Sequence, residues 1–278
     1  MIVSESQPRP GGAWEAQAAV ALGCARSAGA YLRTQFGAAS PRRYQGAHDV
    51  QLAADVEAQR RIVAGLTERF PGYGVLAEEG PVRRWPDAEH VWLVDPLDGT
   101  NNFGYGIAHC AISISLFRRR RPVLALVVDP LLRREFVAVE PPSGEPPAAP
   151  PGPCVPLRRS TISLVTNYSA AGRVWGDRMS EALGGKCKRV TSLWAPALDL
   201  ALVSCGQLDG MICHEGDLLD VGGGTLLVRA AGGHVLDLSG EPFHAHGSMY
   251  RRPVSFVAAR DERLARELLE YARTAAAG

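Results

Sequence analysis

Apolar residues fall at helical spacings between residues 50 and 70, and an alanine-rich run of helical composition occupies residues 13–36. The alanine-rich run ends at Gly37 and the later one at Pro71 and Gly72, residue types that commonly follow the last turn of a helix. An apolar stripe at such spacings packs one face of a helix against a core. The pattern therefore predicts two helices at the start of the fold, before any strand.

Short apolar runs bounded by turn residues replace this pattern in the middle of the chain. Such runs predict strands, and the short turns between several of them favour antiparallel pairing. In the last third of the chain, predicted strands and helices alternate. The strands are expected at residues 74–78, 90–95, 109–117, 122–129, 135–140, 162–167, 209–214, 234–238 and 253–259, and the later helices near 170–183, 195–205, 220–231 and 261–276.

A proline-rich segment separates the two patterns. Residues 141–156 contain eight prolines, and proline fits neither the interior of a helix nor that of a sheet. We therefore expect a surface loop or linker there. It would join an N-terminal α+β half over residues 12–140 to a C-terminal α/β half over residues 157–278, and residues 1–11 would form a flexible tail.

Length and composition are those of an ordinary folded protein. The chain has 278 residues, 46% of them hydrophobic, enough to form a sizeable core without disulfides or a structural metal. Its formal net charge of +1 provides no overall field that would draw it to nucleic acid or to an anionic membrane. The chain shows neither a membrane-spanning apolar run nor a signal-peptide pattern. We therefore predict a cytoplasmic protein whose partners are neither nucleic acid polymers nor membranes.

The strongest candidate for a functional site is the segment LVDPLDGTNNF at residues 93–103, in which an apolar strand ends in two aspartates. The Asp95-Pro96 pair favours a turn that directs the carboxylates of Asp95 and Asp98 to one side. The same turn would expose the carbonyl oxygen of Leu97. Because Mg²⁺ prefers hard oxygen ligands, these three donors within four residues form a candidate magnesium site.

The residues that follow suit the binding of an anion. Gly99 lets the backbone approach a ligand closely, and the N–H groups of Gly99 and Thr100 could hold an anion if a helix begins there. An ordinary Asp-Pro turn with a capping side chain would explain the same residues. Other acidic residues must therefore decide between the two interpretations.

Two further acidic positions are candidates, and each has an ordinary explanation when taken alone. Glu78 and Glu79 stand at the end of a short predicted strand, where a surface acidic pair is common. Asp220 stands at the start of a predicted helix, where capping of the helix would justify an aspartate. The interpretation rests on finding these residues together.

Together these segments resemble the inositol monophosphatase superfamily, which also contains fructose bisphosphatases and phosphoadenosine phosphate phosphatases. The resemblance covers about residues 13–275 and rests on LAEEG at 76–80, DPLDGTNNF at 95–103, LDVGGGTLLVRAAGG at 219–233 and an earlier aspartate, Asp55 in DVQLAAD. It implies a layered α/β/α/β/α sandwich of the α+β class with the site between the two halves. It also implies a homodimer and sensitivity to Li⁺.

The resemblance further implies a role for each matching residue in the hydrolysis of a phosphate monoester. Thr100 paired with Asp55 would orient and deprotonate the attacking water, and Glu78 would take part in catalysis as a metal ligand. The phosphate oxygens would be held by Gly99, Thr100 and Asn101. The ligands implied for two or three Mg²⁺ ions are Glu78, Asp95, Asp98, Asp220 and the carbonyl of Leu97.

Departures from the family pattern concern the substrate. Cys213 stands seven residues before Asp220, where inositol phosphatases usually carry a glutamate that binds a substrate hydroxyl. A thiol is a poor partner for a polyol, so we expect a different small phosphate ester, such as a nucleotide or a modified sugar phosphate, to be preferred over inositol phosphate. Trp194-Ala195 also replaces the usual Gly-Ser that precedes a helix.

Two alternatives stay open. A haloacid-dehalogenase-like phosphatase also carries a DGT segment, and residues 216–220 imitate its late acidic motif, but here two residues instead of one separate Asp95 from Asp98. A non-catalytic protein of the same fold could bind a phosphorylated ligand. Retention of the clustered acidic residues argues against it, because clustering like charges is costly without a function.

Overall fold

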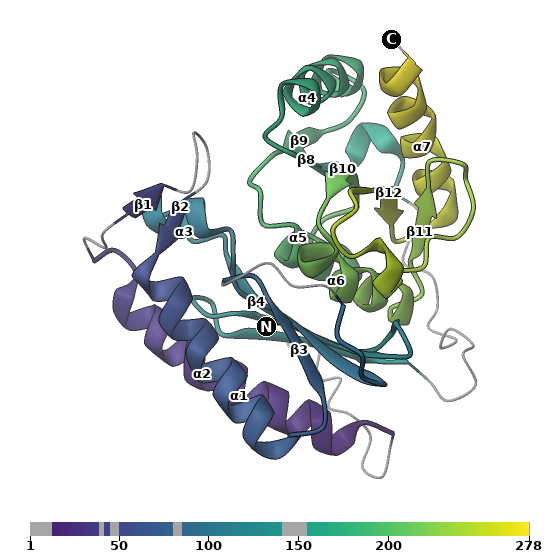
Figure 1. Ribbon diagram of the computed structural model, residues 1–278. Coiled ribbons are helices and arrows are strands. Elements are labelled where there is room, and N and C mark those ends of the chain that lie inside the picture. Colours follow the sequence, from purple (N-terminus) through teal and green to yellow (C-terminus); the bar gives the residue numbers. More distant parts are fainter. Residues whose placement is uncertain (1–12, 39–41, 45–49, 80–84, 141–154, 278) are drawn as a thin grey trace.

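The computed structural model of the chain describes residues 13–38, 42–44, 50–79, 85–140 and 155–277 (Figure 1). The expected tail at residues 1–11 lies outside the described residues. So does the expected proline-rich loop, apart from its last two residues.

The first two long helices form where the apolar pattern predicts them. α1 (Glu15–Gln35) buries a row of alanines against α2 (Ala53–Arg69) and the sheet beneath. Small side chains let the two helices approach closely: a Cβ added at Gly65 of α2 would lie 2.6 Å from the sulfur of Cys24 on α1. The alanine-rich composition therefore serves tight packing as well as helix formation.

A short hairpin precedes the second helix, so the prediction that two helices come before any strand is wrong. β1 (Arg42–Tyr44) pairs antiparallel with β2 (Val50–Leu52), and α2 starts only at Ala53. The backbone N–H of Leu52 donates to Oδ2 of Asp55 at 2.8 Å, which fixes the start of α2. Three-residue strands have too few positions to show a period of two, so backbone pairing overrides the helical pattern at residues 50–52.

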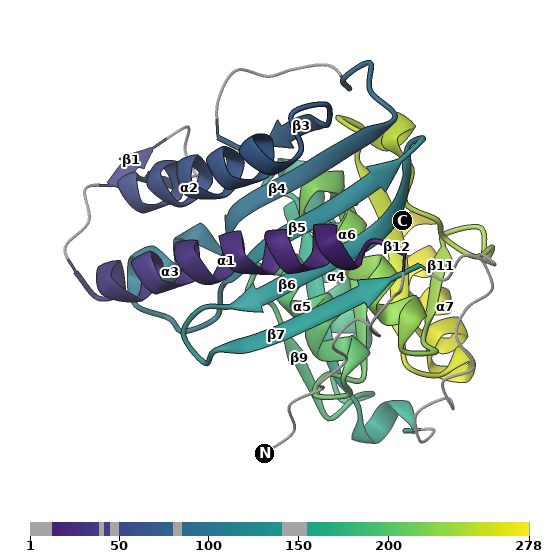
Figure 2. The same cartoon turned by 90° about the horizontal axis from the view of Figure 1, so that it is seen from below.

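The first large sheet is nearly all antiparallel, as expected. Its order is β3-β4-β5-β6-β7, and only β3 and β4 run parallel. Seen from below, α1 and α2 lie across one face of this sheet (Figure 2). The strands span β3 (Gly74–Ala77), β4 (His90–Asp98), β5 (Ala111–Arg118), β6 (Arg121–Asp129) and β7 (Arg134–Val139).

The second large sheet is mixed, in the order β11-β12-β10-β8-β9. The strand pairs β10-β8 and β8-β9 are parallel and the others antiparallel. The short β9 is an element that the sequence pattern did not predict. The strands span β8 (Thr161–Thr166), β9 (Arg189–Thr191), β10 (Gly210–Gly216), β11 (His234–Asp237) and β12 (Val254–Ala259).

Helices separate the two sheets and cover the second one, which gives the predicted α/β/α/β/α layering (Figure 1). α5 (Pro196–Ser204) and α6 (Leu218–Ala230) lie between the sheets. α4 (Ala170–Leu183) and α7 (Glu262–Ala277) pack on the outer face of the second sheet, and the short α3 (Thr100–Tyr105) follows β4. None of the helices in the described part of the chain is long and apolar enough to cross a membrane.

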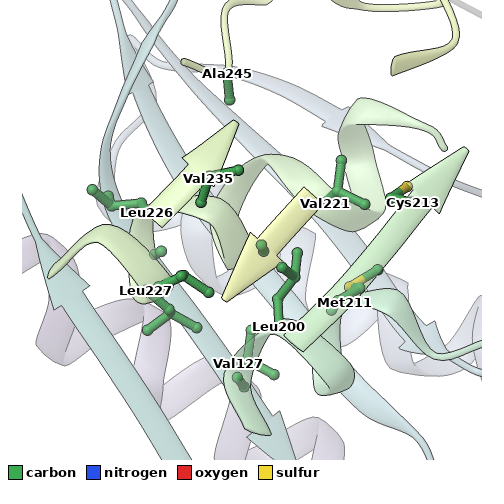
Figure 3. Packing of buried hydrophobic residues seen from close by; sticks show 14 of the residues in the cluster. Val127, Leu200, Met211, Cys213, Val221, Leu226, Leu227, Val235 and Ala245 are labelled. Carbon is green, nitrogen blue, oxygen red and sulfur yellow. The ribbon is translucent and has the colours of Figure 1, made fainter. Parts of the chain in front are cut away.

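The middle layer is held in the core by close contacts on all sides. Figure 3 shows α5 and α6 contributing Leu200, Val221 and Leu226 to one apolar cluster with residues of both sheets. A Cβ added at Gly224 would lie 2.5 Å from Leu200, so α6 needs glycine to approach α5. This packing fixes the first turn of α6, which carries Asp220.

Candidate active site

The end of β4 contains an irregularity that positions the two aspartates. Its register with β5 shifts between Asp95 and Asp98, so the strand bulges at this point and continues through Asp98 instead of ending at residue 95. The N–H of Leu97 donates to Oδ1 of Asp95 at 2.9 Å, as in the turn expected at Asp95-Pro96. A bulge redirects neighbouring side chains, which lets both carboxylates reach the same cavity.

A glycine then turns the chain into α3. Gly99 has φ of 83°, a left-handed conformation, and a Cβ added there would lie 2.8 Å from the carbonyl oxygen of His109. Glycine is therefore required by backbone conformation and by space. The helix that the sequence allowed for does begin at Thr100, whose hydroxyl donates to the carbonyl oxygen of Leu97 at 2.8 Å.

Asp220 does not cap its helix. α6 begins at Leu218, and Asp217 is its N-cap, accepting a hydrogen bond of 2.9 Å from the N–H of Leu219. Helix capping, the ordinary explanation that the sequence suggested for Asp220, therefore applies to Asp217. Asp220 lies within the first turn of α6 and lines a cavity.

That cavity brings most of the predicted residues together. It has a volume of about 370 Å³ and is formed by the ends of β3 and β4, the start of α3 and segments of the second half of the chain. Its wall includes Glu78, Asp95, Leu97, Asp98, Gly99, Thr100, Asn101 and Asp220. Eight residues predicted from three separate sequence segments thus share one hollow.

Asp55 is not among the residues that line the cavity. Its side chain is only 1% exposed, and one carboxylate oxygen accepts a hydrogen bond from the backbone N–H of Leu52 at the start of α2. Its charge nevertheless acts on Glu78, since it contributes to the raised pKa of that carboxyl. Asp55 therefore lies near the site, behind its wall.

Cys213 does not line the cavity either, contrary to its expected place beside the substrate. Its side chain is 1% exposed and belongs to the apolar cluster of the middle layer (Figure 3). The register of β10 with β12 shifts between Cys213 and Gly216. Because of this irregularity, Glu215 lines this side of the cavity and Cys213 does not.

Comparison with known proteins identifies the family. The model of the inositol monophosphatase family matches residues 14–276, nearly the whole chain. The chain belongs to the inositol monophosphatase family. This membership makes it a relative of phosphoric monoester hydrolases and does not favour the haloacid-dehalogenase alternative.

Curated relatives of this family are about one-third identical. An inositol-1-monophosphatase ImpA from Mycolicibacterium smegmatis is 34% identical over 213 residues, covering 72% of this chain and 74% of the relative. An inositol-1-monophosphatase from Mesorhizobium japonicum is 32% identical over 240 residues, covering 80% and 85%. A relative from Xylella fastidiosa, 31% identical over 68% of this chain and 70% of its own length, is named Nus factor SuhB.

Solved structures show the same fold. An inositol monophosphatase from Thermotoga maritima superimposes with a TM-score of 0.81 at 23% identity, covering 94% of this chain and 98% of the other. The extragenic suppressor protein suhB from Bartonella henselae gives a TM-score of 0.81 at 25% identity, covering 93% and 98%. The layered fold predicted for an inositol monophosphatase is therefore confirmed.

The acidic wall of this family member is electrostatically costly. Glu78 is exposed at the rim of this wall, and partial loss of hydration together with the charge of Asp95 raises the pKa of its carboxyl. Burial also raises the pKa values of Asp95 and Asp98, and the charge of Asp220 adds to both. Carboxyls arranged in this way gain from a cation that neutralises their repulsion.

The oxygen donors of the cavity suit a magnesium ion better than a metal ion whose ligands are all protein side chains. Within the described residues, no three or more His, Cys, Asp or Glu side chains form a group that would hold a metal by themselves. Mg²⁺ usually keeps several waters and takes only one or two carboxylates together with oxygens of the substrate. Carboxylates and a carbonyl spread around one open cavity fit that behaviour.

Several wall residues were not expected from the sequence. Asn167, Tyr168 and Glu215 line the cavity beside Trp194, and the side-chain amide of Asn167 donates to the carboxylate of Glu215. Their positions after β8 and at the end of β10 depend on the second sheet facing the first. No local pattern could indicate them, although Glu215 lies only five residues before Asp220.

Proposed function

We propose that the chain is a Mg²⁺-dependent phosphomonoesterase that hydrolyses a small phosphorylated metabolite, such as a sugar, inositol or nucleotide phosphate. The observation that carries the proposal is the convergence of Glu78, Asp95, Asp98 and Asp220 on one cavity of about 370 Å³. These side chains come from three segments of the chain, and the raised pKa values of Glu78, Asp95 and Asp98 reflect the cost of bringing acidic groups together and away from water. A binding site for a divalent cation explains why that cost is retained.

The carboxylates and the carbonyl of Leu97 would hold two or three Mg²⁺ ions. The hydroxyl of Thr100 donates to that carbonyl, and both residues line the cavity. When bound, Mg²⁺ supplies the positive charge that neutralises phosphate oxygens and acidifies the attacking water. The protein residues then have the tasks of placing the ester and the water.

Thr100 and Asp55 are the residues proposed to orient and deprotonate the water, with Glu78 beside them. Thr100 lines the cavity, and the carboxylate of Asp55 lies behind the wall close enough to influence Glu78. In the reaction a water oxygen bonds to phosphorus while the bond from phosphorus to the ester oxygen breaks. The proton lost by the water passes toward this pair, and the departing alcohol oxygen takes a proton from solvent.

The phosphate group is proposed to lie against the first turn of α3. The first turn of a helix directs backbone N–H groups outward, and this turn carries Gly99, Thr100 and Asn101 on the cavity wall. Gly99 permits the left-handed turn that starts this helix, because a Cβ there would meet the carbonyl oxygen of His109 at 2.8 Å. The donors would stabilise charge on phosphate oxygens as it develops during the attack.

Phosphate release from a panel of phosphomonoesters, with Mg²⁺ and with EDTA, tests the proposal. Asp95→Asn and Asp220→Asn should each lower kcat/KM about 100-fold or more, because each removes a charged oxygen ligand at nearly constant size. Asp177→Asn, on the exposed face of α4 and outside the cavity, is the matched control and should keep full activity. Full activity in either cavity variant, or release that EDTA does not stop, would contradict the assignment.

A protein of this fold that binds a phosphorylated ligand without hydrolysing it is the second candidate. The relatives named inositol-1-monophosphatase, at 32% and 34% identity, favour the enzyme over this candidate. The two candidates differ in a direct measurement. Binding of a phosphate ester with no release of phosphate at any Mg²⁺ concentration would favour the second candidate.

The assembly and location also belong to the proposal. We expect a homodimer in the cytoplasm. Tyr105 and Ile107, at and just beyond the end of α3, are 63% and 43% exposed, which is consistent with a contact between two chains. Light scattering at micromolar concentration distinguishes a dimer from a 29.7 kDa monomer.

A further inference from the structure

Two aromatic rings form part of the cavity wall and stack on one another. The ring centroids of Tyr168 and Trp194 are 3.7 Å apart, with an angle of 21° between the planes. Tyr168 follows β8 and Trp194 precedes α5, so the pair joins two loops of the second half of the chain. Both residues line the same cavity as the carboxylates. This wall is flat and apolar, unlike the acidic wall.

The chain holds Trp194 in a costly backbone conformation. Its φ is 52°, in the left-handed region that bulky residues rarely occupy. The neighbouring residues keep it there: the side-chain amide of Asn102 donates to the carbonyl of Leu193, and Ala195 is fully buried. Backbone strain of this kind persists where surrounding structure enforces it, and it concentrates at ligand sites.

A hydrogen bond ties the aromatic pair to the segment proposed to hold the phosphate. The side-chain amide of Asn101 donates to the hydroxyl of Tyr168 at 3.0 Å. Asn101 is in the first turn of α3, directly after Thr100. The flat wall is therefore fixed next to the phosphate position, where the alcohol part of an ester would lie.

An acceptor in the same cavity complements the flat wall. Glu215 also has a left-handed backbone, with φ of 56°, and its backbone N–H donates to the hydroxyl oxygen of Ser255 at 3.0 Å. Its carboxylate accepts a hydrogen bond from the side-chain amide of Asn167. A carboxylate beside stacked aromatic rings suits a planar ring that carries N–H groups.

We infer that the preferred substrate is a phosphate monoester whose alcohol part carries a flat heteroaromatic ring, as a nucleoside monophosphate does, and that Trp194 and Tyr168 select it. This inference rests on the proposed phosphomonoesterase function. Stacking on an aromatic side chain is available to any heteroaromatic ring because each has a π face. A polyol such as inositol has no such face and would gain less from this wall.

Adenosine 5′-monophosphate and ribose 5-phosphate form a matched pair of probes, because both carry the phosphate on C5 of ribose and only one carries a base. Wild-type kcat/KM should be at least about 10-fold higher for adenosine 5′-monophosphate. In Trp194→Ala this ratio should fall about 10-fold, and Trp194→Phe should restore part of it. Trp14→Ala removes an indole outside the cavity and should leave the ratio unchanged.

A wild-type ratio near one, or a ratio that Trp194→Ala leaves unaltered, would overturn the inference. If Trp194→Ala does not fold, Tyr168→Ala provides the same comparison from a side chain that is 38% exposed. If neither ester nor any other phosphomonoester of the panel is hydrolysed with Mg²⁺, the proposed function fails separately. Titration calorimetry with the two esters then decides the inference: tighter binding of adenosine 5′-monophosphate supports it, and equal binding overturns it.

Discussion

The carboxylate oxygen Oδ2 of Asp98 accepts a hydrogen bond of 3.0 Å from the backbone N–H of Leu198, one hundred residues later in the chain. Leu198 is in the first turn of α5, whose N-cap residue Ala195 provides no side-chain cap. A carboxylate at the start of a helix satisfies a free N–H group and interacts favourably with the helix dipole. Asp98 therefore caps α5 from the other half of the chain while it lines the cavity.

This double role predicts that two substitutions of Asp98 separate stability from activity. Asp98→Asn keeps an oxygen that can accept from Leu198, whereas Asp98→Ala does not. Both should lower kcat/KM about 100-fold or more, but the alanine variant should be less stable than the asparagine variant by about 1 kcal/mol. Urea unfolding in EDTA measures the difference. Equal stabilities would show that the contact with Leu198 contributes nothing.

The two aspartates at the start of α6 should respond differently to substitution. Asp217→Ala removes the N-cap acceptor for Leu219 and should destabilise the fold by about 0.5–2 kcal/mol. Asp217→Asn keeps a capping oxygen and should recover most of this loss. Asp220→Asn should instead abolish activity while retaining the helix. A loss of stability in Asp220→Asn as large as that in Asp217→Ala would contradict this division, and thermal unfolding distinguishes the cases.

Cys213 should behave as a core residue. Burial raises the pKa of its thiol to about 12, and its sulfur lies 4.0 Å from the carbonyl oxygen of Val254. Cys213→Glu should therefore destabilise the fold by about 3 kcal/mol or more, since it places a carboxylate in an apolar cluster. It should not improve hydrolysis of inositol 1-phosphate. Cys213→Ala is the control: a stable variant of unchanged substrate preference is expected.

The error at Cys213 shows where counting residues fails. Seven residues before Asp220 is the position of Cys213, but the irregularity in β10 changes which side chains face the cavity, and Glu215 lines it instead. An extra residue in a strand moves following side chains to the other face. Such a shift depends on pairing with β12, which is distant in sequence, so local spacing could not predict it.

Other parts of the molecule were predictable because their physical cause is local. α1 has a composition and a stop residue that suit a helix wherever it packs, and β5 and β6 are long apolar runs joined by a tight turn. The short strands β1 and β9 instead exist only through backbone pairing. The sequence indicated which acidic residues share the cavity because they lie in recognisable family motifs, while the aromatic wall depends on how two loops meet.

The buried carboxyls should make the metal-free protein sensitive to pH. The pKa values of Asp95 and Asp98, which are 2% and 4% exposed, are raised in the fold, mainly by burial. A carboxyl with a raised folded pKa contributes stability that is fully present below its unfolded pKa of about 4 and is lost as the pH rises through its folded pKa. In EDTA, these groups should therefore weaken the fold progressively above about pH 4.

Comparing the wild type with Asp95→Asn isolates this effect from the other titrating groups. In EDTA the two proteins should unfold at similar temperatures near pH 4, and by pH 8 the variant should be more stable by about 1–3 kcal/mol, because asparagine carries no charge. Saturating Mg²⁺ at pH 8 should reverse the order, since it binds and stabilises the wild type more strongly. Differential scanning calorimetry with and without Mg²⁺ measures both differences. A wild type more stable than Asp95→Asn in EDTA at pH 8 would show that repulsion among the cavity carboxylates is relieved without a cation.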